Sequence, residues 1–172
     1  MTPHNFTHKS QEAIQRASQI ANENGQQQVE PPHLFSALLE QEEGVVISVL
    51  KKLNANVPDI RSAIDDMVAY LPKQSGPVPA GGLGQILMGQ SMMYIIQQAS
   101  QEAEKMGDEY ISVEHLLLAY VTHKNPISNL LSDQHVRYDE VLKVLATIRG
   151  TQRVDSLEPE TKYQALEKYG KN

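Results

Sequence analysis

Two pairs of histidines are the first residues to consider for chemistry. His33 and His115 occupy matching sequence contexts, but a catalytic histidine needs a nucleophile and an orienting group within reach. The chain has no cysteine and no nucleophile motif beside either residue. We therefore interpret both as structural histidines that hydrogen-bond a neighbouring loop. His4 and His8 have the i, i+4 spacing of a metal-binding pair, but no third ligand lies nearby in the sequence, so we expect no specific metal site.

Acidic pairs and a glycine-rich stretch also fall short of a catalytic or nucleotide site. Asp65-Asp66 and Glu42-Glu43 are adjacent in the sequence, and adjacent helical residues point in different directions, so we interpret them as solvated surface. The segment Gly81-Gly82-Leu83-Gly84 is followed by neither lysine nor a hydroxyl residue, and G-x-x-x-x-G-K-[ST] occurs nowhere in the chain. The 172 residues are therefore predicted to be no enzyme and to hold no cofactor themselves.

The composition excludes several partners. Lys and Arg number 15 against 21 Asp and Glu, for a net charge of −6, which argues against nucleic-acid binding through clustered positive charge. The absence of cysteine fits a reducing compartment. No segment approaches the roughly 20 apolar residues of a membrane helix, and residues 1–9 lack an apolar signal core. We expect a cytoplasmic protein that binds neither nucleic acid nor membrane.

The elements that would position any site come from an internal repeat at an offset of 82 residues. Ala17-Ser18-Gln19 aligns with Ala99-Ser100-Gln101, and His33-Leu34 aligns with His115-Leu116 in the same register. A gap of one residue extends the match further. Two copies are too few for a solenoid, so we predict a pseudo-twofold globule in which each copy covers the apolar face of the other. The copies span about residues 5–71 (repeat one) and 85–150 (repeat two).

Each repeat is predicted to contain four helices, which gives an all-α fold with eight helices. Apolar residues recur at three- and four-residue steps, and strand signals are nearly absent. Thr7 is a predicted N-cap of the first helix, Gly25 a left-handed C-terminal residue, and Pro31-Pro32 the start of the second helix. The remaining predicted helices span about residues 45–53, 58–71, 85–106, 113–122 (capped by Ser112), 127–131 and 138–148.

Two further segments differ in composition from the repeats. Residues 72–84 are rich in proline and glycine, which is typical of a connector. Residues 151–160 are polar and are predicted to form an exposed linker, followed by a short helix over 161–169. So short a helix cannot bury its apolar side alone. We therefore interpret residues 1–150 as one domain, and 151–172 as a linker and the start of a module belonging to a larger protein.

A tandem four-helix repeat of this kind resembles the Clp N-terminal domain, which precedes the ATPase modules of the Clp family of AAA+ unfoldases and disaggregases. The matching segments are Phe6–Ala13, Val29–Leu39 and Gly107–Leu117. Three features are similar to the ClpB branch rather than to ClpA or ClpC. These are Tyr70–Lys73, the long connector, and Thr161–Gly170, which resembles the entry of ClpB proteins into their first ATPase module.

The resemblance implies a substrate-binding N-terminal domain of an ATP-dependent disaggregase. Such a domain engages unfolded or aggregated polypeptides and delivers them to the AAA+ ring. In the parent protein, ATP and magnesium act in the ATPase modules, the subunits form a homohexamer, and a DnaK-type chaperone is a partner. The 172 residues alone are expected to be monomeric. The alternative is an adaptor-docking domain of a protease-associated ClpC- or ClpA-like unfoldase.

One difference between the repeats suggests a binding surface. Repeat one has Gln11 and Glu12 where repeat two has Met93 and Tyr94. The core-facing positions of that helix are already filled by apolar residues that match between the repeats, so Met93 and Tyr94 are additional. Exposed apolar residues often mark interaction sites, and methionine adapts to varied partners. The alternative, that the two side chains pack beneath the connector or against repeat one, remains open at this point.

Three polar residues are candidates for the rim of that surface. The resemblance implies that Thr7, Asp108 and Glu114 take part in substrate handling, because they match polar positions of the ClpB motif. Each also has a local interpretation: a helix cap for Thr7, a turn residue for Asp108, and a first-turn carboxylate favoured by the helix dipole for Glu114. The candidate substrate-binding residues are therefore Thr7, Met93, Tyr94, Asp108 and Glu114.

Overall fold

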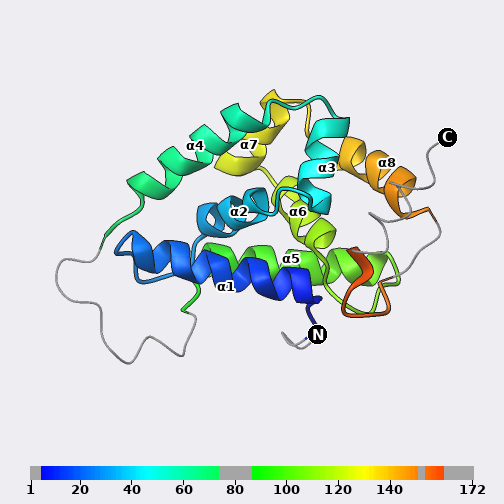
Figure 1. Ribbon diagram of the computed structural model, residues 1–172, viewed down its shortest axis with the longest axis horizontal. Helices are drawn as coiled ribbons and strands as arrows, with labels where there is room; N and C mark the ends of the chain where they lie inside the picture. The colour runs from blue at the N-terminus through cyan, green and yellow to red at the C-terminus, as the bar shows by residue number, and fades with distance from the viewer. Residues whose placement is uncertain (1–4, 74–86, 151–153, 161–172) are drawn as a thin grey trace.

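The computed structural model describes residues 5–73, 87–150 and 154–160 (Figure 1). Over these ranges the chain is all-α, with eight helices and two isolated β-bridges, which confirms the predicted fold class. The helices are α1 (His8–Glu23), α2 (Pro31–Glu40), α3 (Val45–Lys52), α4 (Val57–Tyr70), α5 (Gln90–Lys105), α6 (Val113–Thr122), α7 (Pro126–Asp133) and α8 (Tyr138–Arg149).

The helix boundaries repeat along the chain. Helices α5 and α6 begin 82 residues after α1 and α2, and α7 and α8 begin 81 residues after α3 and α4. The turns repeat as well: Gly25 and Gly107 follow the first helix of each repeat with φ of 68° and 70°, a conformation that costs glycine least. Asn54 and His135 also match, with φ of 59° and 64°. Both repeats therefore follow the same backbone path.

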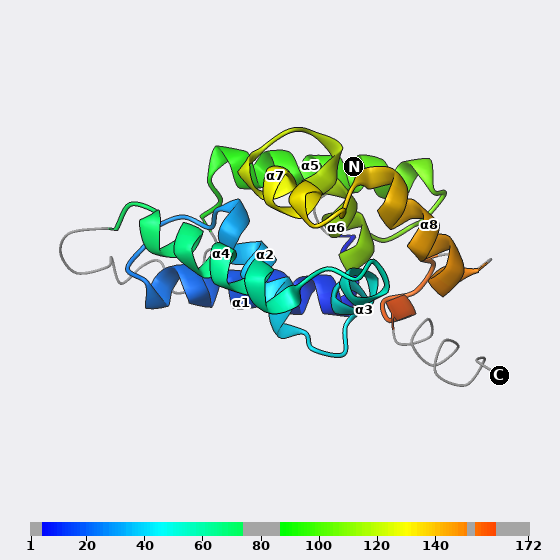
Figure 2. The same ribbon diagram turned by 90° about the horizontal axis from the view of Figure 1, so that it is seen from above.

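The two repeats contact each other reciprocally. Phe6 forms an isolated parallel β-bridge with Ile111, and Val29 forms one with Met88. Met88 is the repeat-two equivalent of Phe6, and Val29 is the repeat-one equivalent of Ile111. The helix contacts are matched in the same way, since α1 packs on α6 as α2 packs on α5, and α3 packs on α8 as α4 packs on α7. Figure 2 shows the repeats side by side, repeat one in blue to cyan-green and repeat two in green to orange. This reciprocity is that of a pseudo-twofold axis.

Local chemistry fixes most helix starts. Thr7 accepts a hydrogen bond from the Ser10 amide (3.2 Å), so it caps α1 as predicted. Asn56 caps α4 through the Asp59 amide (3.1 Å), and Asn125 caps α7 through the Ser128 amide (2.9 Å). Proline lies in the first turn of α2, α4 and α7, where its missing N–H would have no helical partner.

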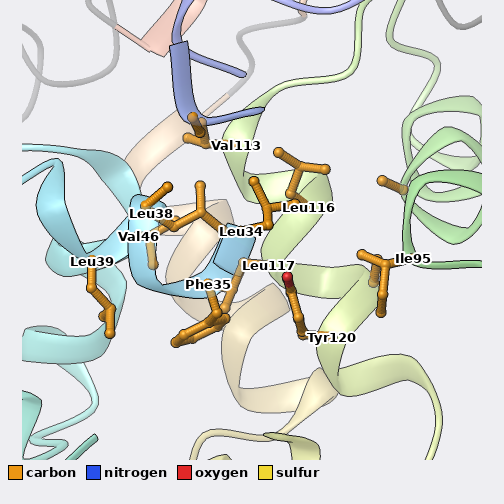
Figure 3. Packing of buried hydrophobic residues seen from close by; sticks show 14 of the residues in the cluster. Leu34, Phe35, Leu38, Leu39, Val46, Ile95, Val113, Leu116, Leu117 and Tyr120 are labelled. Carbon is orange, nitrogen blue, oxygen red and sulfur yellow. The ribbon is translucent and has the colours of Figure 1, made fainter. Parts of the chain in front are cut away.

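The core lies where α2 and α6 meet at the centre of the molecule (Figure 3). The Phe35 and Tyr120 rings meet edge to face, with centroids 4.9 Å apart, an arrangement that aromatic pairs favour. The Tyr120 hydroxyl donates to the Pro31 carbonyl across the repeat boundary (2.7 Å). The two repeats therefore share one continuous apolar core, and neither has a separate core of its own.

Two sequence-based expectations need correction. Helix α5 begins at Gln90 rather than at 85, because the backbone just before it is extended: Val29 N donates to Leu87 O (2.7 Å) and Gly89 N to Val29 O (3.0 Å). The segment 154–160 is not an exposed linker, since Val154, Pro159 and Glu160 are buried. Most of the predicted connector and the whole of the predicted helix 161–169 lie outside the described residues.

Candidate functional site

The exposed apolar pair on α5 is where the repeat comparison placed it. Met93 is 60% exposed and Tyr94 40% exposed, so neither side chain is buried in the core. The alternative of packing beneath the connector falls on residues outside the described ranges. Met92, Ile95 and Ala99 face inward and supply the shared stripe. Helical periodicity turns residues 93 and 94 away from that stripe, as it does the exposed polar residues at the equivalent positions of α1.

A broad groove of about 1720 Å³ runs beside this pair. We call it the α4–α5 groove, because Met67 and Tyr70 of α4 line one side and Met93 and Tyr94 of α5 line the other. The start of α2 and the turn between α6 and α7 also line the groove. From that turn, the His123 ring packs against the Tyr94 ring at a tilt of 38°, with centroids 5.4 Å apart. Pockets lined by apolar residues with a few polar groups are the usual form of a ligand site.

A smaller hollow of about 370 Å³ lies between α1 and α5. Phe6 and Ile14 of repeat one line it together with Met88 and Ile96 of repeat two, and Met93 lines both this hollow and the α4–α5 groove. Met93 therefore stands on the ridge between two apolar depressions, where a flexible, unbranched side chain can follow a bound segment in either direction.

The three predicted rim residues do not lie at this surface. Thr7, Asp108 and Glu114 are all buried, and none of them lines either hollow. The structure thus separates the candidate residues into an exposed apolar pair and a buried polar cluster. The physical reason is that each residue contacts another part of the chain in the interior, Thr7 and Asp108 through hydrogen bonds and Glu114 through an ion pair with Arg149. Their role in binding remains a prediction.

Asp108 is the centre of the buried cluster. Its carboxylate accepts hydrogen bonds from Arg149 Nη2 (2.8 Å) and the Val154 amide (3.0 Å), and its other oxygen lies 2.8 Å from His115 Nε2. Burial alone would raise the pKa of this carboxyl, but the His115 and Arg149 hydrogen bonds outweigh it and hold the pKa well below its usual range. Asp108 is therefore an ionised, fully bonded structural carboxylate.

Glu114 and Thr7 extend the cluster toward the segment that follows α8. Glu114 Oε2 lies 3.4 Å from Arg149 Nη1, so one guanidinium serves two carboxylates. Thr7 Oγ1 donates to Glu160 Oε2 (2.6 Å), and the Val113 amide donates to the same oxygen (3.2 Å). The N-terminal turns of α1 and α6 therefore share one carboxylate that comes from the end of the described chain.

The two histidines at matching positions of the repeats are structural, as predicted. His33 Nδ1 accepts from the Glu30 amide (2.9 Å) and its Nε2 lies 2.6 Å from Gln26 Oε1. His115 Nδ1 accepts from the Ser112 amide at the same distance, 2.9 Å. Because Nδ1 accepts, the ring proton is on Nε2 and points at the loop residue. Burial lowers the pKa of His33 to about 4, so it stays neutral.

Sequence reasoning missed two members of the cluster, Arg149 and Glu160. The one available signal was the substitution of neutral Gln26 by ionisable Asp108 at the matching position, because a buried charge needs a partner. The acidic pairs at 42–43 and 65–66 are exposed, as expected of solvated surface, and Asp66 also lines the α4–α5 groove. No group of three His, Asp or Glu that could hold a metal occurs among residues 5–73, 87–150 and 154–160, and His4 lies outside them. None of the helices described is long and apolar enough to cross a membrane.

Comparison with known proteins gives the family. The model of the Clp repeat N-terminal domain matches residues 5–134. The chaperone protein ClpB of Bacillus anthracis is 36% identical over 167 residues, 97% of this chain, and ClpB 2 of Synechocystis is 37% identical over 170 residues, 99% of this chain. In both cases the match spans 19% of the relative, so the chain corresponds to about a fifth of those proteins.

Solved structures give the same fold. The crystal structure of the Hsp104 N-terminal domain from Candida albicans superposes with a TM-score of 0.77 at 19% identity, covering 91% of this chain and 99% of that one. The N-domain of ClpV in complex with a VipB peptide superposes with a TM-score of 0.65 at 17% identity, covering 84% and 86%. With the family match over most of the chain, these likenesses lead to one conclusion: the chain belongs to the Clp repeat N-terminal domain family and is homologous to the N-terminal region of ClpB chaperones.

Proposed function

We propose that the chain is the substrate-engaging N-terminal domain of a ClpB-like, ATP-dependent disaggregase. In this proposal the α4–α5 groove holds apolar segments of unfolded or aggregated polypeptides and delivers them to the AAA+ ring. ATP and magnesium act in the ATPase modules of the whole protein, which assembles as a homohexamer in the cytoplasm and works with a DnaK-type chaperone. The observation that carries the proposal is the exposed Met93–Tyr94 pair on the edge of the groove.

The chemistry of the groove suits a ligand of variable sequence. Methionines and tyrosines from α4 and α5 supply apolar contact, while Gln97, Gln101 and Asp66 supply polar groups along the same lining. Flexible apolar surfaces accept many sequences because they repack around each one. A neighbour of the same fold, the ClpV N-domain, has been solved with a VipB peptide, which supports polypeptide as the class of ligand.

The test replaces the apolar pair by the residue types of repeat one, Met93→Gln with Tyr94→Glu. Because both side chains are exposed, the free energy of unfolding should change by less than about 0.5 kcal/mol per residue. If the pair anchors bound chains, affinity for a chemically unfolded model protein should fall by about 1–3 kcal/mol, or roughly 5- to 150-fold. Urea unfolding and a fluorescence titration on the same variant measure the two quantities.

Leu87→Gln is the matched control, because Leu87 is an exposed apolar residue outside both hollows. It should leave affinity unchanged. Equal losses for the control and the double variant would indicate non-specific hydrophobic attraction, and unchanged binding by a folded double variant would remove the groove from the proposal. A chain that binds a folded adaptor but no unfolded protein would favour the ClpC- or ClpA-like alternative.

A further inference from the structure

The described segment after α8, residues 154–160, is fastened to repeat two by its backbone. Val154 is fully buried; its carbonyl accepts from the amides of Glu109 (2.8 Å) and Tyr110 (3.3 Å), and its own amide donates to Asp108. Further along, the Leu157 carbonyl accepts from the His8 amide (2.8 Å). The segment, orange-red in Figure 1, therefore lies across the turn before α6 and the start of α1.

Glu160 ends this segment and is its one buried acidic side chain. Its Oε2 accepts from Thr7 Oγ1 and from the Val113 amide at the first residue of α6. An acceptor at this place satisfies a helix N-terminal amide that has no partner within the helix. Glu160 thus joins α1, α6 and the departing chain at a single point.

The repeat comparison shows that this carboxylate fills a place left open by repeat two. In repeat one, Glu30 precedes α2, and its carboxylate lies against Gly89, the equivalent of Thr7. In repeat two the residue that precedes α6 is Ser112, whose side chain is too short to take that place. Glu160 supplies a carboxylate beside Thr7 instead. Helix α2 is thus preceded by a carboxylate of its own repeat, Glu30, whereas the carboxylate beside the start of α6 comes from the segment 154–160.

The surroundings of Glu160 favour a proton on it. Its burial, and then the charge of Glu114, raise the pKa of its carboxyl, and its hydrogen bonds from Thr7 and backbone amides oppose the rise only in part. Glu160 Oε1 has no hydrogen-bond partner among the described residues, which leaves an oxygen that can carry the proton. Among the described residues, the charged and titratable groups of the elements packed around it are Glu114 and His115 of α6, Arg149 of α8, Asp108 before α6, and His8 and Lys9 of α1.

We propose that residues 154–160 form a releasable latch on repeat two, closed when Glu160 is protonated and loosened when it ionises. Closing fixes the direction in which the chain leaves the domain, because the segment is then tied to both α1 and α6. Opening removes Glu160 from the Thr7 hydroxyl and the Val154 amide from Asp108, while Arg149 and His115 still hold the Asp108 carboxylate. The latch is independent of the α4–α5 groove and of the function proposed for it.

The sign of the pH dependence follows from proton linkage. A carboxyl whose pKa is higher in the closed state takes up a proton on closing, so the latch is most stable below the ordinary glutamate pKa and weakens as pH rises. One proton limits the change to tenfold per pH unit. Asp108 does not reverse this sign above pH 4, because its lowered pKa keeps it ionised in the closed state and its ordinary pKa keeps it mostly ionised in the open state.

Amide hydrogen exchange on the 172-residue chain tests the latch. The amides of His8, Glu109 and Tyr110 donate to carbonyls of the segment, so their protection reports closing once intrinsic exchange rates are divided out. Between pH 5 and pH 7 their protection should fall by up to tenfold per unit relative to core amides of α2 and α6. In Glu160→Gln, a neutral isostere that keeps an acceptor for Thr7 and Val113, protection should stay high and flat.

Glu158→Gln is the matched control, because Glu158 belongs to the same segment but is exposed and pairs only with His8 at the surface (3.3 Å). It should keep the pH dependence of the original chain. The latch is overturned if the original chain shows no dependence, if Glu160→Gln keeps it, or if Glu158→Gln abolishes it. It is also overturned if Glu160→Gln leaves the three amides unprotected at pH 5, where a neutral side chain should hold the segment closed.

Discussion

Repeat one and repeat two fasten the end of their last helix with different chemistry. In repeat one, Gln26 accepts from His33 and donates to the Val68 carbonyl of α4 (2.7 Å). In repeat two the matching residues are Asp108, His115 and Arg149, and the link is an ion pair of 2.8 Å. A single amide side chain both donates and accepts, so repeat one needs no charge. A carboxylate only accepts, so repeat two recruits a guanidinium from α8.

That substitution changes what else each repeat must hold. Arg149 also lies beside Glu114, and Glu114 in turn faces Glu160. A buried charge is tolerated only when it is paired and hydrogen-bonded. The buried Asp108 is therefore linked, through Arg149 and Glu114, to Glu160 in the segment after α8. Repeat one closes its network between Gln26 and Val68, which are 42 residues apart, whereas repeat two depends on residues beyond its own last helix.

The largest expected effect comes from removing the acceptor in each repeat. Asp108→Ala removes the carboxylate that lies nearest to the buried Arg149 guanidinium, and should lower the free energy of unfolding by about 3–5 kcal/mol. Gln26→Ala removes a neutral partner from His33 and the Val68 carbonyl and should cost about 1–3 kcal/mol. Urea denaturation of both variants at pH 7 gives the comparison. Equal losses would contradict the view that only repeat two depends on charge.

The next effect separates the repeats by pH. The pKa of His33 is lowered to about 4 in the folded chain. Between pH 6.5 and pH 4, His33 is therefore protonated in the unfolded chain but neutral in the folded chain. Stability from this residue is complete above pH 6.5 and is lost as pH falls toward 4, by at most about 3 kcal/mol. Denaturation at pH 7, 5.5 and 4.5, with the same series on His33→Gln, isolates it. Parallel curves for the two chains would show that His33 binds a proton in the folded state.

The smallest effect concerns the place where repeat two reaches into repeat one. Tyr120 corresponds to Leu38, so only one repeat sends a hydroxyl across the boundary to the Pro31 carbonyl. Tyr120→Phe keeps the ring contact with Phe35 and should cost about 1 kcal/mol for the lost hydrogen bond. Tyr94→Phe, on the exposed face, is the control and should change stability by less than about 0.5 kcal/mol. A Tyr120 variant as stable as the control would make this asymmetry irrelevant to folding.

The sequence-based predictions were accurate where a feature depends on residues close by in the sequence, and failed where it depends on residues far apart. The cap at Thr7, the left-handed Gly25 and the proline start of α2 depend on neighbours within four residues, and the structure confirms all three. The start of α5 was placed five residues early because its preceding strand-like residues pair with Val29, some 60 residues away. The burial of Thr7, Asp108 and Glu114 was missed for the same reason, while their role in binding stays a prediction.

The sequence by itself determined the helices and the repeat, because helical periodicity and the match between copies are local patterns. It marked Met93 and Tyr94 as surplus to the shared core, and the structure decided that they are exposed. Tertiary structure alone decided the partners of the buried charges. Arg149 lies 41 residues from Asp108 in the chain, and Glu160 lies 153 residues from Thr7. Polar residues in a segment such as 154–160 look solvated in sequence, and only the packing of α1, α6 and α8 around them removes their water and gives each a partner.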